Sequence, residues 1–134
     1  YLQTFTVSAN AVLLSISLGS IAAAVLAVNN WRDRVHDKSI GRQTLAVVLG
    51  DKTFTAVFRI MTALPLALGL VMAAAPGFWP CLLVLLCLPL CLPLWKQFGT
   101  LQHEALNATM FGCVKYELAY SVLFSLGALL ACLL

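Results

Sequence analysis

Long apolar segments alternate with short polar breaks along this chain, and the pattern predicts helices that cross a membrane. A run of about 20 apolar residues matches the hydrocarbon core of a bilayer. We expect four spans, with approximate limits at residues 7–37, 52–75, 80–96 and 108–134. Together they predict a single all-α integral membrane domain over residues 1–134, with the lipid bilayer as its surroundings.

The polar breaks predict where the helices end. Thr44 can cap a short apolar helix, and Gly50 can end it, because glycine readily adopts the backbone conformation found just after a helix. The third span contains Pro89 and Pro93, so we expect a kinked or locally broken helix there. Residues 96–107 are polar and are expected to form a loop.

The composition agrees with a membrane protein and excludes several other classes. Hydrophobic residues make up 62% of the chain and charged residues only 10%, whereas soluble domains have about 25% charged residues. Eight Lys and Arg residues in so apolar a chain cannot form an extended basic face. A nucleic-acid partner, a disordered tail and a secreted disulfide scaffold are therefore not expected.

The charged residues are concentrated in one stretch, and this predicts the orientation. Neither residues 1–31 nor residues 60–95 contain Asp, Glu, Lys or Arg, while six of the eight basic residues lie between Arg32 and Arg59. Loops rich in Lys and Arg stay on the cytoplasmic side. We expect the loop over residues 29–51 to be cytoplasmic and the C-terminus to lie outside.

The end of the first span carries a cluster of oxygen-bearing side chains. If the first helix continues to Asp37, then Asn29, Asp33 and Asp37 follow one another at four-residue spacing, and Asn30 joins them at three-residue spacing. Two amides and two carboxylates then share one helix face. Hard oxygen ligands of this kind suit Mg²⁺, which is commonly held by one or two carboxylates together with phosphates and water.

Basic side chains alternate with these ligands, and they suggest the bound group. They are Arg32, Arg34, Lys38 and Arg42. Carboxylates that hold a metal beside guanidinium and ammonium groups would receive a diphosphate rather than a bare cation. The alternative is a solvated loop whose arginines fix topology and whose aspartates pair with them locally. Spacing alone leaves both interpretations open.

The run NNWRDRVHDKSIGRQTLAVVLG, residues 29–50, also resembles a known motif. It is similar to the second aspartate-rich motif of UbiA-type membrane prenyltransferases, and most similar to the branch that acts in menaquinone biosynthesis. The one departure noted is Arg42 where Lys is usual, which keeps the charge and changes the donor geometry.

The resemblance implies a fold and an activity. Members of this family are bundles of nine helices with two such motifs on cytoplasmic loops, which bind a polyprenyl diphosphate through Mg²⁺. This chain would then be the C-terminal half, inactive without its N-terminal half, in a bacterial inner (plasma) membrane. The acceptor would be an aromatic ring, 1,4-dihydroxy-2-naphthoate, and the product demethylmenaquinone.

The expected roles combine the spacing with the resemblance. Asp33 and Asp37 would hold Mg²⁺, with Asn29 and Asn30 completing or orienting the ligand shell. The basic residues that would stabilise the leaving diphosphate are Arg32, Arg34, Lys38 and Arg42. Lys115 can face an acidic substrate in a cavity or extend to the cytoplasmic interface.

Two other functions remain open at this point. One is prenyl transfer to a different acceptor, such as 4-hydroxybenzoate or homogentisate, because a diphosphate motif says little about the ring. The other is a non-catalytic four-helix membrane protein that binds or transports a phosphorylated lipid.

Overall fold

A computed structural model describes residues 7–133 and shows a bundle of long helices. In chain order the elements are α1 (Ala9–Ser39), α2 (Leu45–Ala73), the 3-10 helix η1 (Trp79–Cys87), α3 (Leu88–Thr100), the 3-10 turn η2 (His103–Ala105) and α4 (Leu106–Leu133). Every regular element within this part of the chain is helical. Four passes are long and apolar enough to cross a membrane, which confirms the predicted all-α fold. Leu134, in the last predicted span, lies outside the described residues.

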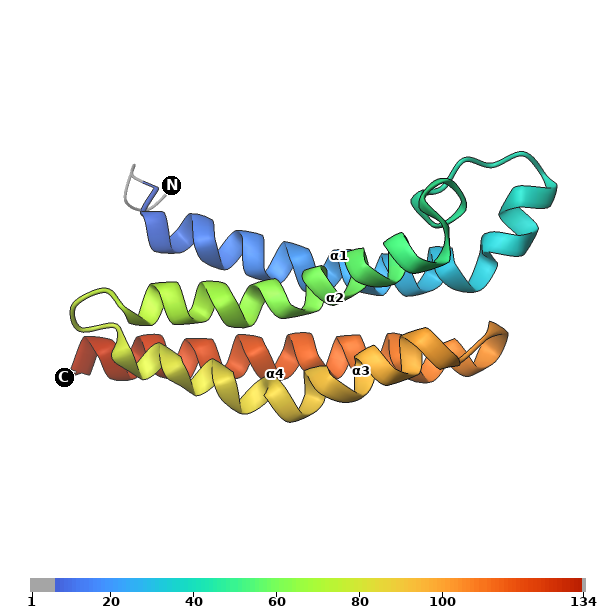
Figure 1. The fold of residues 1–134 in the computed structure, drawn as a ribbon. Helices are drawn as coiled ribbons and strands as arrows, with labels where there is room; N and C mark the ends of the chain where they lie inside the picture. The colour runs from blue at the N-terminus through green and yellow to red at the C-terminus, as the bar shows by residue number, and fades with distance from the viewer. Residues whose placement is uncertain (1–6, 134) are drawn as a thin grey trace.

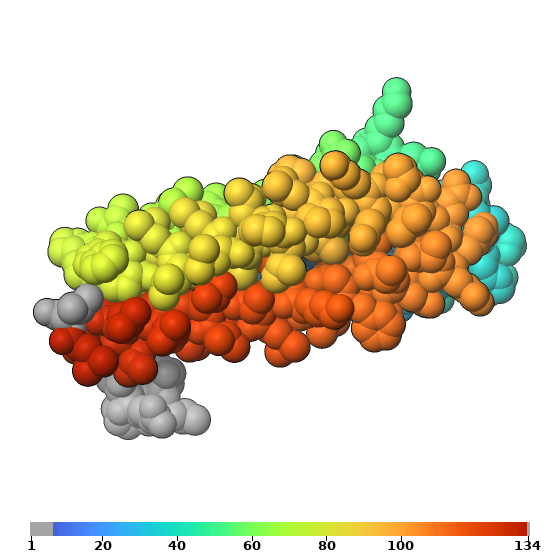
Figure 2. Space-filling view, turned by 90° about the horizontal axis from the view of Figure 1, so that it is seen from below, coloured from blue at the N-terminus to red at the C-terminus, as the bar shows by residue number. Residues whose placement is uncertain are grey.

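Each of the four passes packs against two main neighbours. Both α1 and the η1–α3 pass lie against α2 and α4. Figure 1 shows the start of α1 and the end of α4 at one end of the bundle, with the connection between α1 and α2 at the other. Seen from below in Figure 2, the η1–α3 pass and α4 run side by side along the whole face. The end of α1, which carries the candidate motif, and the connection after it therefore lie at one end of the bundle.

Two glycines shape the connection between α1 and α2. Gly41, just after α1, has φ +75°, and Gly50 has φ +71° and ψ 174° inside the segment assigned to α2. Such positive φ values favour glycine. The non-helical Gly50 divides α2 into a short first helix and a long second one, as predicted. Thr44 is the N-cap residue of the short helix, as predicted, but its hydroxyl oxygen is buried and makes no hydrogen bond.

The third pass is broken into two helix types, as its prolines predict. In η1 the side chains of Cys81, Val84 and Cys87 are fully buried at every third position. This spacing matches the three residues per turn of a 3-10 helix, which keeps all three side chains on one face. From Leu88 onward the buried positions, which include Cys91 and Leu94, are three or four residues apart, as in an α-helix.

The predicted loop over residues 96–107 is mostly helical, which corrects the sequence interpretation. Helix α3 continues to Thr100, and Asn107 already lies in the first turn of α4. The reason is Phe98, which is only 1% exposed and stacks on Phe58 with the ring centroids 3.9 Å apart. Burial of this aromatic side chain outweighs the polarity of its neighbours in the sequence.

Pro65 lies inside α2, and neighbouring helices satisfy the backbone around it. Proline has no N–H group and its ring disturbs the carbonyl four residues earlier. That carbonyl, of Met61, accepts a hydrogen bond of 2.8 Å from the Ser20 hydroxyl of α1. The next carbonyl, of Thr62, accepts one of 2.9 Å from the Tyr116 hydroxyl of α4. Because lipid offers no such partners, these bonds tie α1 and α4 to the middle of α2.

The backbones of η1 and α4 approach each other closely at Gly127. A Cβ atom added at Gly127 would lie 2.7 Å from the backbone oxygen of Pro80 and 3.0 Å from Cα of Cys81. We expect Gly127→Ala to lower the free energy of unfolding by about 1–3 kcal/mol, since backbone atoms must move. Gly19→Ala is the matched control, because a Cβ there meets nothing within 4 Å. Thermal unfolding in detergent would measure both, and equal melting temperatures would contradict the expectation.

Candidate functional site

The oxygen-bearing side chains of the motif lie on one continuous helix. Helix α1 runs to Ser39, so the condition for Asn29, Asp33 and Asp37 to follow one helix face is met. Asn29 and Asn30 are half-buried near the apolar part of the helix. The motif therefore begins where α1 packs against the other helices and continues to the C-terminal end of α1.

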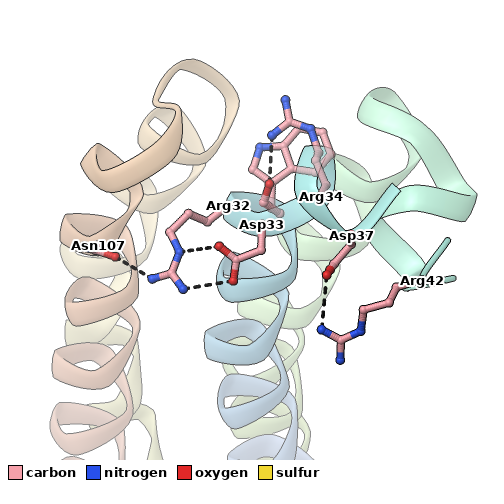
Figure 3. A network of polar contacts seen from close by, with 7 residues as sticks. Arg32, Asp33, Arg34, Asp37, Arg42 and Asn107 are labelled. Carbon is pink, nitrogen blue, oxygen red and sulfur yellow. Dashed lines mark hydrogen bonds and ion pairs between the residues drawn. The ribbon is translucent and has the colours of Figure 1, made fainter. Parts of the chain in front are cut away.

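Asp33 and Arg32 form a two-bond ion pair that reaches across to α4 (Figure 3). Arg32 donates from Nε to Oδ1 of Asp33 at 2.8 Å and from Nη2 to Oδ2 at 3.0 Å. Its Nη1 donates to Oδ1 of Asn107 at 3.0 Å. The Arg32 guanidinium thus links the Asp33 carboxylate on α1 to the Asn107 amide on α4.

Asp37 is paired with a different arginine. Its side chain is buried, with the residue only 3% exposed, and Oδ1 lies 3.3 Å from Nη1 of Arg42. The backbone turns back at Gly41, and the Arg42 N–H donates to the Asp37 carbonyl at 2.8 Å. In Figure 3 the carboxylates of Asp33 and Asp37 are turned toward different arginines rather than toward a common point. The shared helix face was predicted, but this separation of the side chains was not.

Arg34 is held by an aromatic ring. Its guanidinium carbon lies 3.9 Å from the ring centroid of Trp31, and its Nη1 donates to the Trp31 carbonyl at 2.9 Å. Trp31 in turn stacks on Phe54 and contacts Phe98, both with ring centroids 5.5 Å away. We call Trp31, Phe54, Phe58 and Phe98 the aromatic cluster; it joins α1, α2 and α3, and Trp31 itself belongs to the motif.

Two open pockets lie on different sides of the α1 end. The larger, of about 660 Å³, is lined by residues of α1 and by residues around η2 and the start of α4, among them Arg32, Asp33, His36, His103, Glu104 and Asn107. The smaller, of about 300 Å³, is lined by Arg34, Lys38 and residues of the first part of α2. Of the four predicted basic residues, Arg34 and Lys38 line the smaller pocket, and Arg42 lines neither. Only Arg32 borders the larger one.

Lys115 is not brought to the motif. It lies on α4, two turns beyond Asn107, and its side chain is exposed. It lines neither of the two pockets at the α1 end. The structure therefore leaves both interpretations of Lys115 open.

Asn107 is a candidate site residue that the sequence did not reveal. It was expected at the end of a loop, and nothing local pairs it with Arg32, which is 75 positions away. His103, also on the larger pocket, has a positive φ of 51°, which is uncommon for a residue other than glycine. Neither feature leaves a signal in a single sequence.

The motif offers oxygen donors of the kind that a magnesium ion binds. Over residues 7–133, no group of three or more His, Cys, Asp and Glu side chains is placed to hold a metal. Mg²⁺ usually takes one or two protein carboxylates and completes its shell with substrate phosphates and water. The two aspartates and two amides on α1 are donor types that suit a metal arriving with a diphosphate, although the two carboxylates face different arginines in this structure.

Comparison with known proteins relates this chain to prenyltransferases. The 1,4-dihydroxy-2-naphthoate octaprenyltransferase of Haemophilus influenzae is 32% identical over 135 residues, which cover 97% of this chain and 43% of that protein. The enzyme of the same name from Bacillus subtilis is 27% identical over 136 residues, or 98% of this chain and 43% of that protein. The chain thus spans less than half the length of these relatives. No solved structure matches it significantly.

A family profile covers most of the chain, including the whole motif. The profile that matches residues 1–112 is that of the UbiA prenyltransferase family. The match includes α1, α2, α3 and the first turns of α4, so it contains every residue of the motif and Asn107. The resemblance seen in the motif is confirmed, and the chain belongs to the UbiA prenyltransferase family.

Proposed function

We propose that this chain is the C-terminal part of a membrane enzyme that transfers a polyprenyl group from its diphosphate to 1,4-dihydroxy-2-naphthoate. The allylic C–O bond breaks, diphosphate leaves, and the ring carbon that loses its carboxyl group as carbon dioxide gains the prenyl group. The product is the hydroquinone form of demethylmenaquinone, because none of these bond changes oxidises the ring. The observation that carries this proposal is the motif Asn29–Asp37, placed at the exposed end of α1 in a family of prenyltransferases.

The carboxylates are assigned to metal binding. Asp33 and Asp37, with Asn29 and Asn30, would hold Mg²⁺ together with the diphosphate. When bound, Mg²⁺ neutralises charge on the departing diphosphate. The separate arginine pairs of the two aspartates would orient both carboxylates before substrate arrives.

The larger pocket is assigned to the diphosphate. Its volume of about 660 Å³ and the polar side chains among its lining residues, which include Arg32 and Asn107, suit a charged head group. Arg32 can reach that pocket from α1, while Lys38 and Arg34 border the other side of the same helix end. Together with Arg42 they would stabilise the negative charge that develops as the C–O bond breaks. The prenyl chain itself would lie against the apolar helices.

The remainder of the active site is assigned to an N-terminal half. The relatives are more than twice as long as the region that this chain matches. We propose that the missing part supplies a second aspartate-rich motif, and that the chain alone is inactive. We further propose that the protein lies in a bacterial inner membrane, with the motif on the cytoplasmic side and the C-terminus outside, since the basic residues gather around the motif.

Assays of the full-length enzyme would test the proposal. Membranes that contain it should convert octaprenyl diphosphate and 1,4-dihydroxy-2-naphthoate to a prenylated naphthoquinone in the presence of Mg²⁺, as detected by mass spectrometry. Parallel reactions contain 4-hydroxybenzoate or homogentisate. If only 4-hydroxybenzoate or only homogentisate is prenylated, that compound is the acceptor and the assignment of 1,4-dihydroxy-2-naphthoate is wrong. Binding of the diphosphate without any product would instead support a carrier of phosphorylated lipids and refute the enzymatic proposal.

A further inference from the structure

Arg32 is held in place by a contact between distant parts of the chain. Neighbouring side chains on a helix diverge by about 100°, so residues i and i+1 do not face each other. Arg32 nevertheless donates two hydrogen bonds to Asp33. The Arg32 side chain is 29% exposed and the Asp33 side chain is 44% exposed. An exposed pair of this kind is weakly ordered by its own attraction. A third contact is needed to fix it.

Asn107 supplies that contact from another helix. Its Oδ1 accepts the bond of 3.0 Å from Nη1, the one terminal nitrogen that Arg32 does not offer to Asp33. The Asn107 side chain is half-buried in the first turn of α4 and lines the same pocket as Arg32 and Asp33 (Figure 3). The three residues therefore form a chain from α4 through the guanidinium to the carboxylate.

We infer that Asn107 is a positioning residue for the metal–diphosphate site, acting through Arg32 on Asp33. A planar guanidinium with two parallel bonds to a carboxylate fixes the plane of that carboxylate. With Arg32 anchored on α4, the unshared lone pairs of Asp33 keep one direction. This inference rests on the proposed function, because it assigns the metal and the diphosphate to Asp33.

A binding experiment on the full-length enzyme would test the inference without turnover. The probes are Mn²⁺, followed by the loss of its free electron paramagnetic resonance signal, and farnesyl thiodiphosphate, whose bridging sulfur blocks ionisation. Asn107→Leu keeps the approximate size and removes the acceptor. We expect it to weaken Mn²⁺ binding in the presence of the probe about tenfold, as is typical when a partner of a metal ligand is lost.

Three further variants separate positioning from a general effect on folding. Asn107→Asp keeps an acceptor oxygen and should bind Mn²⁺ within about threefold of the wild type. Gln102→Leu changes an exposed amide in the preceding loop and should have no effect. When Arg32→Lys is already present, adding Asn107→Leu should weaken Mn²⁺ binding by less than about threefold, because the two residues act as one unit.

The outcomes separate this inference from the proposed function. Three results would each overturn the positioning role. Asn107→Leu could leave Mn²⁺ affinity unchanged, or Asn107→Leu and Asn107→Asp could lower it equally. The third is a further tenfold loss of Mn²⁺ affinity when Asn107→Leu is added to Arg32→Lys. If the wild type binds both probes and shows this pattern but prenylates no aromatic acceptor, the proposed function fails while the role of Asn107 stands. Failure of the wild type to bind either probe would overturn both.

Discussion

Replacing Asp33 by alanine is expected to slow prenyl transfer by the full-length enzyme roughly 1,000-fold, since a bound metal stabilises charge by several kcal/mol and each 1.4 kcal/mol is about tenfold in rate. Asp33 is a sharper test than Asp37. The Asp33 side chain is 44% exposed, whereas residue Asp37 is only 3% exposed, so the loss of Asp37 would disturb the packing more. The initial rate of naphthoquinone formation at saturating substrates measures the effect.

Two companion variants make the Asp33 result interpretable. Asp33→Asn removes the charge and keeps the shape, and it should be nearly as slow as Asp33→Ala. Glu117→Gln makes the same change of charge and shape in α4, away from both pockets at the α1 end, and should leave the rate close to that of the wild type. Retention of more than a third of the wild-type rate by Asp33→Ala would refute the assigned role.

The largest loss of stability is expected for Trp31→Ala, at about 3–5 kcal/mol in the free energy of unfolding. Trp31 is 5% exposed, stacks on Phe54 at an interplanar angle of 13°, and supports the Arg34 guanidinium. Its loss would open a cavity between three helices. Trp31→Phe, which keeps a stacking ring, should cost less than half as much. Thermal unfolding in detergent, with folding reported by protease resistance, measures both.

Trp79 is the matched control for this prediction. It is also a tryptophan at the end of a membrane pass, but it is 61% exposed. Trp79→Ala removes the same side chain and should shift the melting temperature only slightly. Similar losses for Trp31→Ala and Trp79→Ala would show that the aromatic cluster does not stabilise the fold.

The apolar pattern was enough to predict the spans, because burial in lipid depends on the composition of each segment by itself. The chain breaks at Gly41 and Gly50 were predictable for a similar reason, since a positive φ depends on the residue at that position. The extent of α3 was not readable. Phe98 is helical and buried because Trp31 and Phe58 meet it, and both are remote in the sequence.

The candidate site shows the same division between local and distant causes. The helical spacing of Asn29, Asp33 and Asp37 was predictable from one stretch of sequence. Which arginine each carboxylate faces was not, because it depends on the return of the chain at Gly41 and on an amide from α4. A single sequence contains no information on which distant side chains meet.

The 3-10 geometry of η1 also sets how far the third pass reaches. At about 2.0 Å per residue, nine residues extend about 18 Å, where an α-helix would cover about 13.5 Å. A segment of 22 residues therefore spans as much hydrocarbon as an α-helix roughly three residues longer. Deleting one residue of η1 would draw α3 inward by about 2 Å and rotate it by about 120°, which would turn Phe98 away from Trp31. The length of the third pass and the position of Phe98 in the aromatic cluster therefore depend on the same helix geometry.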